Sequence, residues 1–361
     1  MKIAIILGTR PEIIKMSPII RECEKRKIEY FIIHTNQHYS PQMGKIFFDD
    51  LELPLPKYNL NVESGNNGEK IGKMWILIEK NLLEEKPDVI LVQGDTNTVL
   101  AGALAASKVG IKMGHVEAGL RSYDRTMPEE VNRVLTDHLS DFLFVPTERA
   151  KENALKEGIE NKKIFVTGNT IVDAVYQNVE IADKKINVLK DLELKEKTYI
   201  LVTLHRPSNV DSKENLSNLL QAFKKIHEQF KMPLIFPMHP RTEKMMQIFG
   251  LKIPAGLKAI KPVGFLEFLQ LEKNARLILT DSGGVQEEAC ILGVPSVILR
   301  ENTERPETLE VGAGILAGNN IGGMISSAEK MMNTNKKWKN PFGDGRSAER
   351  IMDILGKELS S

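Results

Sequence analysis

The chain has 361 residues, more than one compact hydrophobic core normally holds, so two domains are expected. Its net charge of +1 excludes a global attraction to nucleic acid or to an anionic membrane, so an anionic ligand must be held by local groups. Cys23 and Cys290 have neither metal-ligand spacing nor a paired framework, which favours a reducing compartment such as the cytoplasm. No His, Cys or carboxylate cluster has ligand spacing either, and no metal is expected.

Short apolar runs alternate with longer amphipathic stretches, a pattern typical of βα units on parallel sheets. In the first half the predicted strands are Lys2–Leu7, Tyr30–His34, Asp88–Val92, Lys112–Val116, Phe142–Val145 and Lys163–Thr167. In the second half they are Tyr199–Leu204, Leu234–Met238, Leu257–Ile260, Leu277–Thr280 and Ser296–Leu299. The intervening stretch Val172–Lys197 is helical and then charged, so we expect domains 1–170 and 171–345. The tail Ser347–Glu358 is predicted to be a last amphipathic helix.

Ligands of open α/β sheets bind beyond the carboxyl ends of the strands, which directs attention to the residues that follow each strand. After the first strand comes Gly8–Glu12, where Arg10 lies at a predicted helix start and Lys15 one turn further. This arrangement suits a diphosphate clamp, and the alternative is a tight turn with a surface arginine. The G-x-G-x-x-G spacing of a dinucleotide site is absent, and so is a P-loop.

A second polar stretch, Asp281–Gly284, follows a predicted strand and precedes a helical run. Gly283 and Gly284 would allow close approach of the backbone to a ligand, and Ser282 would add a donor. Glu288 lies further along the helix and could accept hydrogen bonds from ribose hydroxyls. The alternative is a glycine-rich turn with a capping side chain.

Three carboxylates also follow strands or open helices in the first half. Asp95 could act as a base or could cap the following helix. Glu117 ends a buried strand, where its pKa should be raised, or it could pair with Arg121. Glu129 and its neighbour Glu130 fill the first turn of a helix, which the helix dipole alone would explain.

The second half adds an imidazole or a guanidinium at three more positions. His205 follows a predicted strand, and His239 likewise follows another predicted strand. Arg305 could reach a sugar or phosphate, or it could make a surface ion pair. The cationic and imidazole groups suit the binding of a nucleotide-sugar diphosphate. The carboxylates would not help to bind an anion and are available for chemistry.

Several long motifs occur in order along the chain: Gly8–Pro18, Gly114–Arg121, Pro128–Arg133, Asp281–Ala289, Thr303–Glu307 and Asn340–Gly345. With these motifs the chain closely resembles the non-hydrolysing UDP-N-acetylglucosamine (UDP-GlcNAc) 2-epimerases, essentially from end to end. The resemblance implies a glycosyltransferase-B (GT-B) fold, with two Rossmann-like domains facing across a cleft and a C-terminal helix, 346–361, that returns to the first domain. It also implies a homodimer and the interconversion of UDP-GlcNAc and UDP-N-acetylmannosamine (UDP-ManNAc).

The resemblance also assigns roles to individual positions. The matching UDP-site positions are Arg10, Lys15, Phe268, Ser282, Gly283, Gly284, Glu288 and Arg305. The matching catalytic positions are Asp95, Glu117, Glu129 and His205. Of these, Asp95, Glu117 and His205 also match substrate-binding positions. Gln37, Gln42 and His239 resemble parts of a regulatory site for a second UDP-GlcNAc. Pro207, however, stands where bacterial relatives usually have a second arginine, so regulation by substrate is in doubt.

Inversion at C2 of the sugar breaks a C–H bond that is not next to a carbonyl. Oxidation by NAD is one route, and the missing dinucleotide motif disfavours it, so no cofactor is expected. The other route expels UDP as the C2 proton leaves, giving a 2-acetamidoglucal to which UDP then adds back. UDP must stay bound between the two half-reactions, and domain closure is expected. A hydrolysing epimerase, a glycosyltransferase and a non-catalytic nucleotide-sugar sensor stay open as alternatives.

Overall fold

The computed structural model describes residues 1–36, 41–62, 65–334 and 337–360, apart from the side chains of residues 41–44. The chain divides into two compact units: residues 1–177 with 342–361 form the first, and residues 178–341 form the second. The chain passes from the first unit to the second inside helix α7, Thr170–Lys185. No helix among the described ranges is long and apolar enough to cross a membrane.

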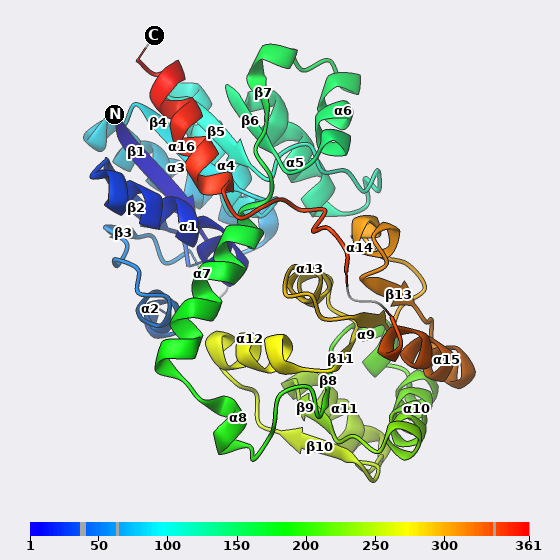
Figure 1. The fold of residues 1–361 in the computed structure, drawn as a ribbon. Coiled ribbons are helices and arrows are strands. Elements are labelled where there is room, and N and C mark those ends of the chain that lie inside the picture. The colour runs from blue at the N-terminus through cyan, green and yellow to red at the C-terminus, as the bar shows by residue number, and fades with distance from the viewer. Residues whose placement is uncertain (37–40, 63–64, 335–336, 361) are drawn as a thin grey trace. The chain divides into compact units, whose positions relative to one another are not determined.

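The first unit contains a seven-stranded sheet in the order β3-β2-β1-β4-β5-β6-β7, in which neighbouring strands are parallel (Figure 1). Its strands are β1 (Lys2–Leu7), β2 (Glu29–His34), β3 (Tyr58–Asn59), β4 (Val89–Gln93), β5 (Lys112–Val116), β6 (Phe142–Val145) and β7 (Ile164–Val166). All six strands predicted in this half are found within about two residues of their expected bounds. The sequence analysis missed β3, because a strand of two residues has too little length for a periodic signal.

The helices of the first unit are α1 (Arg10–Arg26), α2 (Pro41–Asp50), α3 (Asn67–Glu85), α4 (Asn97–Val109), α5 (Pro128–Leu139), α6 (Glu148–Lys156), a 3-10 turn at Asn161–Lys163, most of α7, and α16 (Ser347–Glu358). Helices α3 and α4 pack side by side, and their apolar side chains join those of the sheet in one core. That core includes Ile6, Ile33 and Val92 from three neighbouring strands. Burial of the strands under helices explains why they are almost continuously apolar.

The last helix, α16, covers the residues predicted for it and packs against α1, as the red and blue helices of Figure 1 show. Arg26 of α1 makes an ion pair with Asp353 of α16 at 2.6 Å. Asp173 of α7 accepts hydrogen bonds from the backbone N–H groups of Ser347 and Ala348 at 3.2 and 2.9 Å. This carboxylate therefore caps the start of α16, whose first N–H groups would otherwise lack partners.

The second unit contains a six-stranded parallel sheet in the order β10-β9-β8-β11-β12-β13. Its strands are β8 (Ile200–Thr203), β9 (Leu234–Pro237), β10 (Leu257–Ile260), β11 (Leu277–Thr280), β12 (Ser296–Ile298) and β13 (Gly314–Leu316). Its helices are α8 (Val188–Asp191), α9 (Pro207–Val210), α10 (Lys213–Phe230), α11 (Pro240–Phe249), α12 (Phe265–Asn274), α13 (Gly283–Ile291), α14 (Pro306–Glu310) and α15 (Ile321–Met332). Strand β13, of three residues, is the one strand of this unit that the sequence analysis missed.

Candidate active site

Each sheet has one point where its strand order reverses, and both points carry the polar residues singled out in the sequence. In the first unit the reversal lies between β1 and β4, and in the second between β8 and β11. The residues after β1 and β4 include Arg10 and Asp95, and those after β8 and β11 include His205 and Ser282. Ligand sites in doubly wound sheets form at such points, so the topology supports the interpretation of these stretches as binding loops.

The turn after β1 is built on a buried carboxylate. Glu12 accepts hydrogen bonds from the backbone N–H groups of Gly8 and Thr9, each at 2.6 Å, and from the Thr96 hydroxyl at 2.5 Å. Burial raises the pKa of Glu12 to about 7 even though these donors favour the ionised form. Arg10 follows as the first residue of α1 and is exposed, with its guanidinium 5.7 Å from the centre of the Phe47 ring. The spacing of Thr9 and Glu12 is that of a capping box, a signal that was available in the sequence.

Glu117 lies just beyond β5 and is held by two donors. Lys15 of α1 donates to both carboxylate oxygens, at 2.6 and 2.8 Å, and Gln93 donates at 2.8 Å. The Glu117 side chain is 6% exposed, and its backbone φ is 69°, in the left-handed region that a residue with a side chain rarely occupies. Such strain is typical of functional positions. The alternative pairing with Arg121 is wrong, because that guanidinium binds Asp137 and Glu157 at 2.7 and 2.6 Å.

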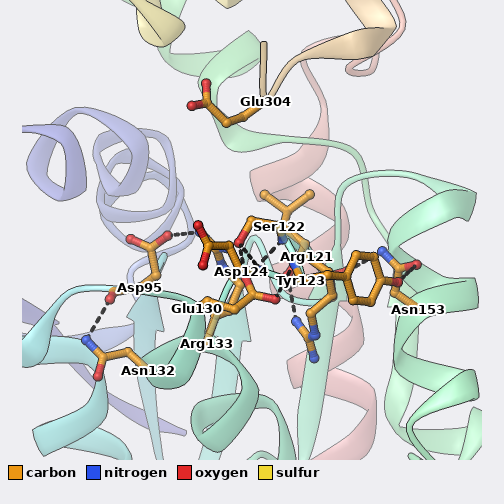
Figure 2. Close-up of polar contacts among 12 residues, drawn as sticks. Asp95, Arg121, Ser122, Tyr123, Asp124, Glu130, Asn132, Arg133, Asn153 and Glu304 are labelled. Atoms are coloured by element: carbon orange, nitrogen blue, oxygen red, sulfur yellow. Dashed lines mark hydrogen bonds and ion pairs between the residues drawn. The ribbon is translucent and has the colours of Figure 1, made fainter. Parts of the chain in front are cut away.

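Asp95 follows β4 and makes an ion pair with Arg133 of α5 (Figure 2). Asn132, the preceding residue of α5, donates to the backbone carbonyl of Asp95 at 2.9 Å. Helix α4 starts at Asn97 and its N-cap is Thr96, so the alternative role of Asp95 as a helix cap is wrong. Asp95 is instead an anchored, partly exposed carboxylate.

The two adjacent glutamates that open α5 have different surroundings. Glu130 is buried and accepts from the backbone N–H groups of Ser122 and Tyr123, each at 2.9 Å, and from Arg133 at 2.5 Å (Figure 2). Burial would raise the pKa of Glu130, but these donors outweigh it, and the pKa is lowered. Glu129 is exposed, and its side chain makes no hydrogen bond or ion pair within the described ranges. Sequence reasoning based on the helix dipole alone missed the role of Glu130 in holding the loop before α5.

In the second unit, Asp281 organises the turn that presents His205. This fully buried carboxylate accepts from the backbone N–H groups of His205 and Arg206, at 3.0 and 2.9 Å, and from the Asn209 amide at 3.2 Å. Nδ1 of His205 is 3.2 Å from Asp281, and the His205 side chain is 41% exposed. Burial would raise the pKa of Asp281, but its interactions with His205 and Arg206 lower it. An ionised carboxylate thus holds an accessible imidazole in place.

The stretch Ser282–Gly284 forms the N-terminus of α13. Ser282 is the N-cap residue, and its side chain makes no capping hydrogen bond. A Cβ atom at Gly284 would meet no heavy atom within 4 Å, and one at Gly283 would meet only Glu304, at 3.9 Å. The two glycines therefore leave room for a ligand beside the first turn of α13, and the N–H groups at a helix start suit an anion.

The other predicted UDP-site residues of the second unit lie around α12, α13 and α14. Phe268 is half-buried on α12, and Glu288 is half-buried on α13. Nε of Arg305 lies 2.6 Å from Glu287, whose side chain is 4% exposed, so this pair is more than the surface contact considered as its alternative. Nothing in the sequence pattern pointed to Glu287 as the group that orients Arg305.

Of the three residues assigned to a regulatory site, only His239 can be placed. Its ring centre is 5.5 Å from that of His205, and its Nδ1 accepts from the backbone N–H of Arg241 at 3.1 Å. Burial, followed by the nearby His205 and Arg241, lowers the pKa of His239. Gln37 and the side chain of Gln42 lie outside the described residues.

Two Rossmann-like α/β halves, each with polar groups at its switch point, are the halves of a GT-B fold, which confirms the predicted fold class. The sequence pattern of the family described as UDP-N-acetylglucosamine 2-epimerase matches residues 21–356. The chain belongs to the UDP-N-acetylglucosamine 2-epimerase family.

Individual relatives agree with this membership. A UDP-N-acetylglucosamine 2-epimerase of Methanocaldococcus jannaschii is 62% identical over 361 residues, covering 98% of this chain and 99% of that protein. The crystal structure of the M. jannaschii UDP-GlcNAc 2-epimerase in complex with UDP-GlcNAc and UDP has a TM-score of 0.86 and covers 99% of this chain and 100% of its own. A Pseudomonas aeruginosa UDP-2,3-diacetamido-2,3-dideoxy-D-glucuronate 2-epimerase is 39% identical over 361 residues, covering 99% of this chain and 100% of that protein.

Proposed function

We propose that the protein is a non-hydrolysing UDP-GlcNAc 2-epimerase that interconverts UDP-GlcNAc and UDP-ManNAc. The observation that carries the proposal is the pair of anchored carboxylates Asp95 and Glu117, which follow the adjacent strands β4 and β5. Acid–base chemistry on two faces of a sugar ring needs at least two such groups. The 62% identity to the M. jannaschii enzyme, whose structure contains UDP-GlcNAc and UDP, supports this substrate.

The proposed reaction has two reversible halves. A carboxylate removes the proton from C2 while the C1–O bond to UDP breaks, and the electron pair of the C–H bond forms the C1–C2 double bond of a 2-acetamidoglucal. UDP then adds back at C1 while a carboxylic acid returns a proton to the opposite face of C2. Asp95, Glu117 and Glu129 are the proposed acid–base groups, and the strained backbone at Glu117 supports its inclusion.

The departing diphosphate needs positive or hydrogen-bonding groups. We assign this role to Arg10, Lys15, His205 and Arg305, with the open end of α13 at Ser282, Gly283 and Gly284. Phe268 is assigned to contact with the UDP moiety, and Glu288 is assigned to the ribose hydroxyls. Asp281 supports the role of His205, since it fixes the imidazole from the buried side.

Incubation of the enzyme with UDP-GlcNAc in heavy water tests the proposal. It should give UDP-ManNAc with deuterium at C2, detected by NMR and mass spectrometry. Accumulation of free N-acetylmannosamine and UDP would instead show a hydrolysing epimerase, and tight binding without turnover would show a sensor. Parallel incubation with UDP-2,3-diacetamido-2,3-dideoxy-D-glucuronate tests the activity that the Pseudomonas relative is named for.

The proposal extends to the setting of the reaction. We place the enzyme in the cytoplasm, where it would supply ManNAc-type sugars for cell-surface polysaccharide or glycan synthesis, and we expect a homodimer. Light scattering on the purified protein measures the oligomeric state.

A further inference from the structure

His115 is a histidine with no exposed surface in the middle of β5, and both of its ring nitrogens have close partners. Nδ1 lies 2.6 Å from a carboxylate oxygen of Asp137, and Nε2 lies 2.7 Å from the backbone carbonyl oxygen of Gly94. A carbonyl oxygen can only accept a hydrogen bond, so Nε2 must donate. The other ring nitrogen, Nδ1, has the carboxylate of Asp137 as its partner.

The surroundings of Asp137 favour its ionised form. Its second oxygen accepts from the backbone N–H of Gly119 at 3.1 Å and lies 2.7 Å from the guanidinium of Arg121. Burial would raise the pKa of Asp137, but the charges and hydrogen bonds of His115 and Arg121 lower it. The same guanidinium also binds Glu157 at 2.6 Å, so Arg121 joins two carboxylates. Asp137 therefore links the imidazole of His115 to the backbone of Gly119 and to the guanidinium of Arg121.

This network reaches the two turns that carry the proposed catalytic carboxylates. Gly94 directly precedes Asp95 and has a φ of 83°, and Gly119 lies two residues after Glu117 and has a φ of 77°. A Cβ atom at Gly119 would lie 2.3 Å from the backbone oxygen of Ala150, so that turn is also packed tightly. Backbone in the left-handed region persists where its surroundings fix it. His115 and Asp137 supply such contacts to both turns from the buried side.

We propose that His115 is a positioning residue, which holds the Gly94–Asp95 turn and, through Asp137, the Glu117–Gly119 turn in a fixed relation. The inference rests on the proposed function of Asp95 and Glu117. His115 itself has no exposed surface, so we assign it no contact with substrate. Its effect would be on the geometry of proton removal and return, and displacements of about 1 Å in such geometry lower rates by up to about a hundredfold.

The test compares His115→Gln and Asp137→Asn with the wild-type enzyme in heavy water. We expect kcat to fall by about 10- to 100-fold in both variants, while KM for UDP-GlcNAc and the Kd for UDP change less than about threefold. The second readout is the early ratio of deuterated UDP-GlcNAc to deuterated UDP-ManNAc, which reports the face to which the proton returns. A change in the relation of the two turns should alter this ratio, whereas a loss of stability alone should not.

His227→Gln is the matched control, since Nδ1 of His227 lies 2.7 Å from the backbone oxygen of Met232 in the second unit. It should lower the thermal unfolding temperature and leave kcat and the deuterium ratio unchanged. If His115→Gln folds poorly, Asp137→Asn, which has nearly the same shape as the native side chain, gives the same readouts. Wild-type kcat and deuterium ratio in a folded variant would overturn the role of His115. If the wild-type protein does not epimerise UDP-GlcNAc, the result would instead overturn the proposed function.

Discussion

The ammonium group of Lys15 lies 2.6 Å from a carboxylate oxygen of Glu117, although the two residues are 102 positions apart in the chain. Their side chains are 12% and 6% exposed, so this ion pair is largely shielded from water and less screened than a surface pair. Lys15 was expected to contact UDP and Glu117 to exchange a proton. The ion pair means that a change at either residue will affect its partner.

Glu117→Gln should lower turnover by about 10²- to 10⁴-fold, because an amide cannot accept the C2 proton. UDP affinity should change little, since Gln can still accept from Lys15. Steady-state kinetics and calorimetry with UDP measure the two effects. Glu85→Gln is the control, because Glu85 also pairs with a lysine, Lys2, at 2.9 Å and is not assigned to the chemistry. Wild-type turnover in Glu117→Gln would remove Glu117 from the mechanism.

Gly284→Ala should weaken UDP binding by at least about tenfold without loss of stability. The added methyl group meets no atom within 4 Å beyond its own stretch of helix, but it fills space beside the first turn of α13, where glycine allows close approach of a ligand. Gly72→Ala is the matched control, since that helical position is also open, and it should leave UDP affinity unchanged. Equal UDP affinity for Gly284→Ala and the wild type would argue against a phosphate at this helix end.

Glu12→Ala should lower the free energy of unfolding by about 2–4 kcal/mol, because the backbone N–H groups of Gly8 and Thr9 lose a buried acceptor. Urea denaturation followed by a probe in the first unit measures this loss. Glu69→Ala removes the glutamate of a comparable capping box at the exposed start of α3, and it should cost less. Equal losses in the two variants would show that the burial of Glu12 does not matter.

The stability contributed by Glu12 should fall as the pH rises. Its folded pKa of about 7 lies above the ordinary value of 4.5 because burial favours the neutral acid. The unfolded chain therefore releases this proton first, and the contribution is fully present below about pH 4.5 and lost as the pH passes through about 7. Between these limits the free energy of unfolding should fall by about 3 kcal/mol relative to Glu12→Gln, which does not titrate. Parallel pH profiles for the two proteins would contradict the raised pKa.

Glu272→Met should raise the unfolding temperature of the second unit, most strongly at alkaline pH. Glu272 is fully buried, and its carboxyl group interacts with the carboxyl group of Glu288. Burial, followed by the charge of Glu288, raises its pKa well above the ordinary value. Ionisation at high pH thus costs stability, and methionine removes that cost. Calorimetry at pH 6 and pH 9 measures the difference, with exposed Glu329→Gln as the control.

The sequence predicted the long, apolar strands of both sheets, because burial on two faces leaves a continuous apolar run. It did not reveal β3 and β13, whose two and three residues are fixed by pairing with neighbouring strands. The loops that follow the strands were visible as polar, glycine-rich stretches. The interaction partners of the loop residues were not visible in the sequence. His115 and Asp137, for example, are brought together only by the packing of α5 on β5.

The two glutamates of α5 also show that sequence spacing does not reveal the partners of a side chain. Sequence spacing cannot tell which of Glu129 and Glu130 points inward, since both lie in the first turn. The structure buries Glu130 against the N–H groups of Ser122 and Tyr123 and leaves Glu129 exposed. The resemblance to the family singled out Glu129 for chemistry, and this exposure is compatible with that proposal.

The first unit needs α16, which Asp173 caps, and α16 is synthesised last. The order of synthesis therefore affects how the first unit folds. Residues 178–341 leave the ribosome before Ser347–Glu358, so the second unit can fold while the first still lacks its last helix. Until then, the face of α1 that meets α16 is uncovered, and Arg26 lacks Asp353. The nascent first unit is thus the more vulnerable of the two to proteolysis and aggregation, although its sheet is synthesised first.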